Sequence, residues 1–265
     1  TVFPIWNSKK LMLSRAEFYI SEIVIHNADG SQTPLTDQYI LVNANDPGAE
    51  FNLGNWNVAD AVGITLHLGV PASVNHNDPS AWPVEHPLSP KFPSMHWGWT
   101  AGYRFLAIEG LADGNNDGTP ETTMEFHNVG DELYKTVDLN GIAKAENGKL
   151  HIHLIVDYAK LFDNMSLKGS LIWHGNAAPN VAMMDNAAKP GFITMASLSA
   201  TDGSLPASDK IRISPNPSVD KTTIQYDLSG FAKPNMLITD ESGSKVMRIE
   251  SIAPAGNLDI STSAS

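Results

Sequence analysis

The chain has 265 residues, no cysteine, nine histidines and a formal net charge of −12. Without cysteine it forms neither disulfides nor thiolate metal sites, and its negative charge disfavours binding to the phosphates of nucleic acid. No apolar run approaches the roughly 20 residues of a membrane-spanning helix, so we expect no membrane span. At about 100 to 200 residues per domain, the length allows one large domain or two smaller ones.

Most of the chain has the composition of short β-strands separated by turns. Residues 17–25 (EFYISEIVI) are rich in β-branched and aromatic side chains and predict a strand, which the turn pair Asp29-Gly30 follows. Further strands are predicted at 39–42, 63–68, 103–109, 123–126 and 150–156, and short helical turns at 156–162 and 180–188. This spacing predicts a mostly β fold, with an immunoglobulin-like β-sandwich and long loops over residues 1–200.

A change of composition near residue 200 predicts a second domain. Residues 201–210 are rich in Ser, Gly, Pro and Asp, which is typical of a linker. Beyond them, short strands are predicted at 211–213, 222–226, 235–239, 245–249 and 258–260. We expect residues 211–265 to form a small immunoglobulin-like β-sandwich that is incomplete at its C-terminus. No signal peptide starts at Thr1, so we expect either a cytoplasmic chain or one numbered from its processed end.

Three ordered motifs lie in the C-terminal part: Pro215-Asn216-Pro217, TIQYDL at 223–228 and LITDESGSKV at 237–246. Together they resemble the type A sorting domain of the type IX secretion system, although the closing Gly-x-Tyr strand of that family is missing. The resemblance implies the type IX machinery as a partner, with export across the outer membrane of a Gram-negative bacterium and release or anchoring at its surface. An ordinary small β domain is the alternative.

The densest motifs lie in and after a Pro-rich loop over residues 71–95. Because proline fixes the backbone φ angle, this composition predicts a long, stiff loop suited to a preorganised site. The motifs are FYISEI at 18–23, LGVP at 68–71, NHNDP at 75–79, PL at 87–88, MHWGW at 95–99, GYRF at 102–105 and FHNVG at 126–130. Over residues 11–200 they resemble the MbnP-like copper-binding family.

Histidines of the Asn-His loop and of the His-x-Gly segment hold copper in this family. The resemblance therefore implies His76 and His127 as the primary ligands. One extra residue separates His127 from Gly130, compared with the family pattern. Some members add an oxidised tryptophan two residues before the loop histidine, but here that position is Val74.

Met95, His96 and His86 are secondary candidates, because thioether sulfur and imidazole both bind copper. Neighbours in an extended strand point to opposite faces, so Met95 and His96 cannot both face one site without a bulge. A ligand histidine also needs an acceptor for its other ring proton. The nearest such residues in the sequence are Asn75, Asp78 and Glu85.

The remaining histidines and tryptophans have plainer interpretations. His151 and His153 alternate along one strand, a spacing that can bind a metal, but a solvated strand face is the favoured interpretation. His174 is expected to be a non-ligand. Trp97 and Trp99 share one face of a strand, and core packing is favoured over redox chemistry for both.

Residues 113–118 (DGNNDG) match the opening of a calcium loop, in which oxygens of Asp113, Asn115 and Asp117 would converge. Position 12 of such a loop is Met124 here, not glutamate. A polar hairpin tip is therefore the favoured interpretation, with calcium as the alternative.

The sequence contains no nucleophile elbow, phosphate loop, dinucleotide fingerprint or zinc-protease motif, so we expect no catalysis. The predicted function is copper binding at or outside the surface of a Gram-negative cell, for acquisition, storage or delivery. A copper acceptor or a dihaem peroxidase-like enzyme would be the partner. The alternatives are a structural or adhesive surface protein without a copper site, and an electron-transfer protein.

Overall fold

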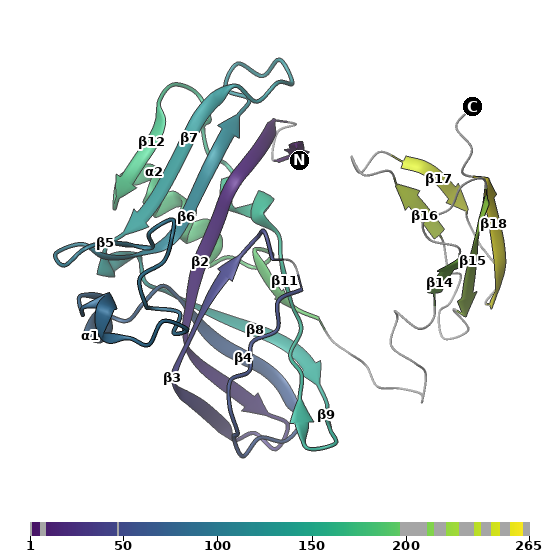
Figure 1. Ribbon diagram of the computed structural model, residues 1–265, viewed down its shortest axis with the longest axis horizontal. Coiled ribbons are helices and arrows are strands. Elements are labelled where there is room, and N and C mark those ends of the chain that lie inside the picture. The colour runs from purple at the N-terminus through teal and green to yellow at the C-terminus, as the bar shows by residue number, and fades with distance from the viewer. Residues whose placement is uncertain are drawn as a thin grey trace. The chain divides into compact units, whose positions relative to one another are not determined.

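The computed structural model describes residues 2–5, 9–46, 48–196, 211–214, 221–227, 236–239, 245–249 and 255–261. The chain divides into two compact units, Thr1–Ser199 and Ala200–Ser265, and strands dominate both of them (Figure 1). This agrees with the predicted mostly β fold. The predicted linker over 201–210 lies outside the described residues. Among the helices described, none has the length and apolar character needed to cross a membrane.

A nine-stranded sheet forms most of the first unit. Its strands follow the order β12-β7-β6-β2-β4-β8, while β1 and β3 pair with β2, and β5 pairs with β6. Strand β12 pairs with β7 in parallel, and the other pairs of this sheet are antiparallel. The bounds are β1 Val2–Pro4, β2 Lys10–Asn27, β3 Gln32–Asn43, β4 Ala61–Leu68, β5 His96–Gly98, β6 Gly102–Ala112, β7 Thr122–Val129, β8 Lys135–Ala143 and β12 Leu171–Gly175.

The long strand β2 connects the two halves of the sheet. Its first half pairs with β6 and its second half with β4, as Figure 1 shows. The register shifts between Ser21 and Ile23, where Glu22 has a φ angle of 46°. Because a bulge bends a strand, β2 changes direction there and produces a sandwich-like arrangement. The predicted strand over 17–25 is thus the middle of a longer one.

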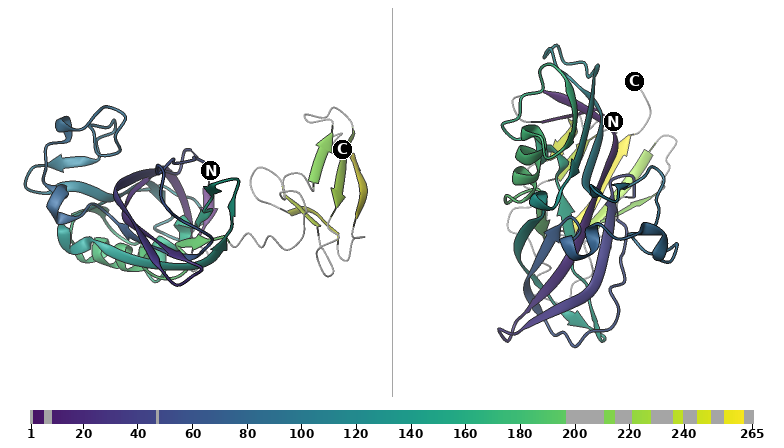
Figure 2. Two further views of the ribbon diagram at one scale, coloured as in Figure 1. Left: turned by 90° about the horizontal axis from the view of Figure 1, so that it is seen from below. Right: turned by 90° about the vertical axis from the view of Figure 1, so that its left-hand side faces the viewer.

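Helix α2 (Ala178–Ala187) covers one face of the β12-β7-β6 part of the sheet (Figure 2). Met124 and Phe126 of β7 are buried in the core, and Asn128 approaches Met183 of the helix at 3.7 Å (Nδ2–Sδ). Since side chains alternate along a strand, the residues between these point to the opposite face. That opposite face of β7 carries the candidate site.

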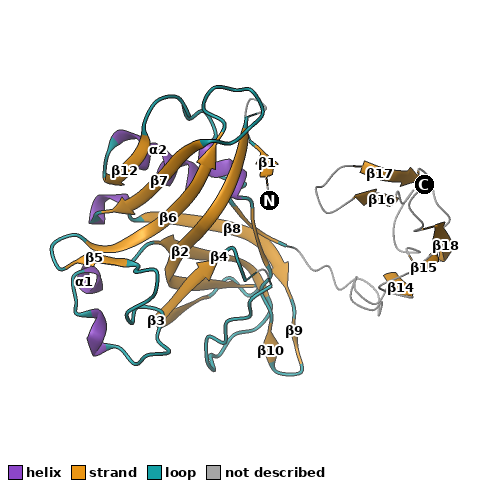
Figure 3. Cartoon of the chain, turned by 45° about the horizontal axis from the view of Figure 1, so that its top comes forward, coloured by secondary structure: helices purple, strands orange, loops and turns teal. Residues whose placement is uncertain are grey.

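The Pro-rich loop contains two short helices. It holds α1 (Ala72–Asn75) and the 3-10 helix η2 (Pro79–Ala81), which Asp78 caps by accepting a hydrogen bond from the Ser80 amide at 2.8 Å. Figure 3 shows this loop beside β5. The other elements of the unit are η3 Asp131–Leu133, β9 Ala145–Glu146, β10 Lys149–Leu150, β11 Leu154–Val156, η4 Tyr158–Phe162 and β13 Ile193–Met195.

The second unit contains the strands that the sequence predicts. Strands β14 (Ile211–Ser214), β15 (Lys221–Asp227) and β18 (Ala255–Ser261) form a three-stranded antiparallel sheet. Strands β16 (Met236–Thr239) and β17 (Lys245–Ile249) form a separate antiparallel pair. The Pro215-Asn216-Pro217 motif and residues 240–244 of the expected hairpin lie outside the described residues.

Candidate metal centre

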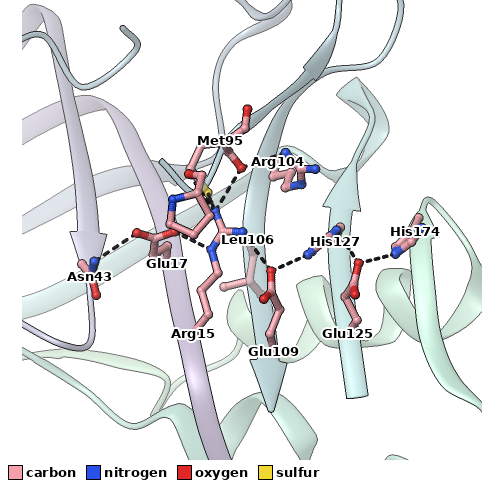
Figure 4. A network of polar contacts seen from close by, with 12 residues as sticks. Arg15, Glu17, Asn43, Met95, Arg104, Leu106, Glu109, Glu125, His127 and His174 are labelled. Carbon is pink, nitrogen blue, oxygen red and sulfur yellow. Dashed lines mark hydrogen bonds and ion pairs between the residues drawn. The ribbon is translucent and has the colours of Figure 1, made fainter. Parts of the chain in front are cut away.

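Three neighbouring strands place polar side chains on the face of the sheet that α2 leaves uncovered. Glu125 and His127 alternate along β7, and His174 of β12 is the direct partner of His127 in the parallel pair. Glu109 of β6 pairs with Glu125 across the antiparallel β6–β7 ladder. Figure 4 shows these side chains in a row on one side of the strands.

The ligand atoms of Glu125, His127 and His174 lie within 4.8 Å of one another. Glu125 Oε1 is 2.7 Å from His174 Nε2 and 3.1 Å from His127 Nδ1. The two imidazole rings stack, with centroids 5.0 Å apart and planes 13° from parallel. Two imidazoles and one carboxylate form a donor set that suits borderline metals such as copper and zinc.

His127 presents a bare ring nitrogen to this group. The residue is only 5% exposed, and its Nε2 lies 2.9 Å from Glu109 Oε1. Its Nδ1 lies 3.1 Å from Glu125 Oε1 but makes no hydrogen bond among the described residues. Since an ionised carboxylate only accepts, we assign the proton to Nε2. Burial lowers the pKa of His127 and keeps the ring neutral. A neutral imidazole with a free nitrogen is the form that binds a metal ion.

Arg15 fixes the carboxylate that orients His127. Its Nη1 donates to Glu109 Oε1 at 2.8 Å, and its Nε donates to Glu17 Oε2 at 2.6 Å. Burial would raise the pKa of Glu109, but the hydrogen bonds from His127 and Arg15 outweigh it and lower that pKa. Glu109 therefore stays ionised and holds the ring proton of His127 on Nε2.

Trp97 lies against both imidazoles. Its ring centroid is 5.5 Å from that of His127 and 4.8 Å from that of His174, and Arg104 Cζ lies 4.3 Å from the indole centroid. Trp97 is 41% exposed and Trp99 61%, so the expectation that they pack in the core was wrong. The strand that was expected to carry both tryptophans, β5, is short and ends at Gly98. Trp99 lies in the turn that follows.

A buried amide of helix α2 ties the two histidine strands together. Asn180 is fully buried, and its Nδ2 donates to the main-chain oxygens of His127 at 2.9 Å, Gly175 at 2.8 Å and Trp173 at 3.3 Å. Asn180 thus adds side-chain hydrogen bonds to the backbone ladder that pairs β7 with β12 at the candidate site.

His76 lies in a different environment from His127. Its Nε2 is 3.1 Å from Asp131 Oδ2 and its Nδ1 is 3.0 Å from the main-chain oxygen of Trp99. The hydrogen bond to Asp131 raises the pKa of His76, and Asn75 donates to the other oxygen of Asp131 at 2.7 Å. In the described part of the chain, His76 belongs to no group of three metal-binding side chains. That His76 and His127 bind one copper ion together stays a prediction. In the structure, the histidine next to His127 is His174.

The secondary candidates also lie outside the group around Glu125. Met95 is 1% exposed, and its sulfur accepts a hydrogen bond from Arg15 Nη2 at 3.1 Å. His96 has a buried Nε2 without a hydrogen-bond partner. His86 stacks on Trp82, with centroids 4.1 Å apart.

The loop over residues 113–121 is the hairpin tip between β6 and β7, as favoured from the sequence. Asp113 accepts hydrogen bonds from the amides of Asp117 and Gly118, each at 3.0 Å, and Asn115 donates to Asp117 Oδ2 at 3.0 Å. The carboxylates of Asp113, Asp117 and Glu121 lie within 4.8 Å of one another. Because the loop itself occupies oxygens of Asp113, the geometry gives no separate indication of calcium.

Sequence reasoning did not select Glu125, Glu109 or Arg15 for this site, and it disfavoured His174. One available signal was the alternation of Glu125 and His127, which places a carboxylate beside an imidazole on one strand face. The parallel pairing that adds His174 has no local signal in the sequence.

Comparison with known proteins gives one family and one solved structure. A family model described as MbnP matches residues 2–184. MbnP from Methylosinus trichosporium is 19% identical in sequence, with a TM-score of 0.40 over 66% of this chain and 74% of that chain. No curated protein matches.

Proposed function

The chain belongs to the MbnP family, and on this basis we propose that it binds copper through His127, His174 and Glu125. The observation that carries the proposal is the buried, bare Nδ1 of His127, which faces the other two donor groups. A buried polar atom without a partner costs about 1–3 kcal/mol, which a bound metal ion would recover. A structural or adhesive role offers no such compensation.

The two remaining donors are accessible to solvent. The side chains of His174 and Glu125 are 38% and 33% exposed. Copper would therefore enter and leave on their side, while the hydrogen bond to Glu109 keeps the ring of His127 in place. Imidazole and carboxylate together suit Cu(II), and two imidazoles suffice for Cu(I).

We propose that copper is cargo for acquisition, storage or delivery, without catalytic turnover. Exchangeable cargo needs an accessible site, which the exposed His174 and Glu125 provide. A copper acceptor or a dihaem peroxidase-like enzyme would meet the protein at this face, where Trp97 and His174 are exposed.

We also propose that the second unit directs export by the type IX secretion system to the surface of a Gram-negative cell. The proposal is supported by the order of the three C-terminal motifs. It is also supported by strand β15, which overlaps the motif at 223–228, and by strands β16 and β17, which overlap the two ends of the motif at 237–246. Removal of residues 201–265 should then keep the protein from reaching the cell surface. Surface labelling of intact cells measures this, and unchanged labelling would refute the role in export.

Copper loading of the full chain tests the site. We expect His127→Gln/His174→Gln to lose the tightly bound copper, and His76→Gln/His96→Gln to keep it. Metal analysis after dialysis measures the copper, and unfolding midpoints establish that each variant is folded. Equal copper in the wild type and the His127/His174 variant would refute the site. Loss in the His76/His96 variant alone would instead assign the copper ligands to His76 and His96.

A further inference from the structure

Two histidines outside the candidate site project from one exposed face of the first unit. His151 and His153 lie between β10 and β11, in a segment where Ile152 and Leu154 pack against the core. Both histidines are exposed, in strict alternation with these apolar residues. Residues two apart in an extended segment point to the same side, so the two imidazoles are neighbours.

The imidazole rings of His151 and His153 contact each other. Their centroids are 6.5 Å apart and their planes 30° from parallel. Among the described residues, neither ring takes part in a hydrogen bond or an ion pair. By contrast, His26 Nε2 lies 2.9 Å from Thr65 Oγ1, and His67 Nδ1 lies 3.2 Å from the main-chain oxygen of Glu22. A metal ion at His151 and His153 would therefore displace no hydrogen bond or ion pair of their rings among the described residues.

The separation of the two rings suits chelation of one ion. Metal–imidazole bonds are about 2 Å long, so rotation of the side chains brings one nitrogen of each ring to a common ion. No third side chain of the described residues completes a group there, which leaves water in the remaining positions. Such a site exchanges ions readily and binds less tightly than one with three protein ligands.

We propose that His151 and His153 form a second metal site, which takes a divalent borderline cation from solution. Cu(II) is the preferred ion, because it binds nitrogen ligands more tightly than the other first-row divalent metals. The two imidazoles act as a chelate, and removal of either one lowers the affinity by about tenfold or more, since the second ligand is held at a high effective concentration. The site is independent of the one around His127.

The test uses the full chain in the His127→Gln/His174→Gln background, so that copper at the first site does not contribute. Titration with Cu(II) should give one equivalent whose electron paramagnetic resonance spectrum shows nitrogen ligation. His151→Gln and His153→Gln should each raise the dissociation constant about tenfold or more. His67→Gln, which removes a histidine that already has partners, should leave it unchanged.

Binding that is unaffected by His151→Gln and His153→Gln would overturn the proposal, as would an equal effect of His67→Gln. These outcomes are separate from a failure of the first site. The first site is tested by the tightly bound copper that remains after dialysis and is lost in His127→Gln/His174→Gln, whereas the second is tested by titration of a chain that already lacks both of those histidines. His151 and His153 are exposed, whereas His127 is buried and His67 is half-buried. The unfolding midpoint of each variant, including the His127→Gln/His174→Gln background, therefore establishes that a loss of binding is not a loss of folding.

Discussion

His127 and His174 are direct partners across the parallel pair β7–β12, and their rings stack 5.0 Å apart. The two strands are far apart in the sequence, so the distance between the imidazoles is set by whatever holds the strands in register. In the described residues, the amide of Asn180 reaches the backbone of both strands. Geometry at the candidate site therefore depends on a residue that does not touch the metal-binding atoms.

Asn180→Ala should lower both stability and copper affinity. It removes hydrogen bonds to three main-chain oxygens and should reduce the free energy of unfolding by about 1–3 kcal/mol. Asn186→Ala is the matched control, because the Asn186 amide donates to the main-chain oxygens of Leu161 and Asp163, away from the site. Denaturant unfolding and copper titration measure the two effects. An equal loss of copper affinity in both variants would show that Asn180 acts only through stability.

Glu109→Gln should weaken copper binding while leaving the three ligands in place. An amide no longer fixes the proton on His127 Nε2, and loss of such an orienting partner typically costs about 10- to 100-fold in metal affinity. Competition with a copper chelator measures the affinity. Glu121→Gln removes a carboxylate from the β6–β7 hairpin tip and should have no effect, and unchanged affinity in Glu109→Gln would contradict the orienting role.

His127 and His76 should affect the pH dependence of stability in opposite ways. Burial lowers the pKa of His127 below its ordinary 6.5, so the unfolded chain gains a proton first and stability falls as the pH drops below that value. The hydrogen bond to Asp131 raises the pKa of His76, so its contribution is complete below 6.5 and is lost as the pH rises through the raised value.

Urea unfolding of the metal-free chain across this pH range measures both contributions. His127→Gln should lose less stability on acidification than the wild type does. His76→Gln should be most destabilised, relative to the wild type, at acidic pH. A pH dependence that either variant leaves unaltered would contradict the corresponding assignment.

Trp97 should report copper binding by its fluorescence. Its indole lies 4.8 Å from the ring of His174, and a Cu(II) ion at the site would quench it at that range. Titration of the wild type should therefore show quenching that is largely absent in Trp97→Phe. Trp99→Phe is the matched control on the same hairpin, and retained quenching in Trp97→Phe would place the ion elsewhere.

Much of the fold is predictable from local patterns. Alternation of apolar and polar residues identifies most of the strands, and the helical turns at 156–162 and 180–188 correspond to η4 and α2. The single strand predicted over 150–156 was wrong, because residues 151–153 separate β10 from β11. Strand lengths are less predictable: β2 continues well beyond residues 17–25 because it pairs with different neighbours along its length. The length of β2 thus depends on tertiary contacts, which cannot be read from the β-propensity of its residues.

The candidate site is predictable only in part. His127 stands out through its motif, whereas His174 becomes relevant only when β12 joins β7 in parallel. The loop histidine His76 has an equally clear motif, yet its ring nitrogens face Asp131 and a main-chain oxygen. Arg15 and Glu109 lie 94 positions apart and meet across β2 and β6, a relationship that depends on strand register.

The parallel pairing of β12 would give a metal bound by His127 and His174 a mechanical role. Antiparallel neighbours can be joined by a short turn, but the chain that leads from His127 back to its partner His174 runs through the whole crossover from β8 to η4. An ion held by both residues would close that crossover as a covalent cross-link closes a loop, in a protein that has no cysteine to do so. Copper would then fasten the edge strand β12, and amide hydrogen exchange in β12 would slow on loading more than exchange in β4.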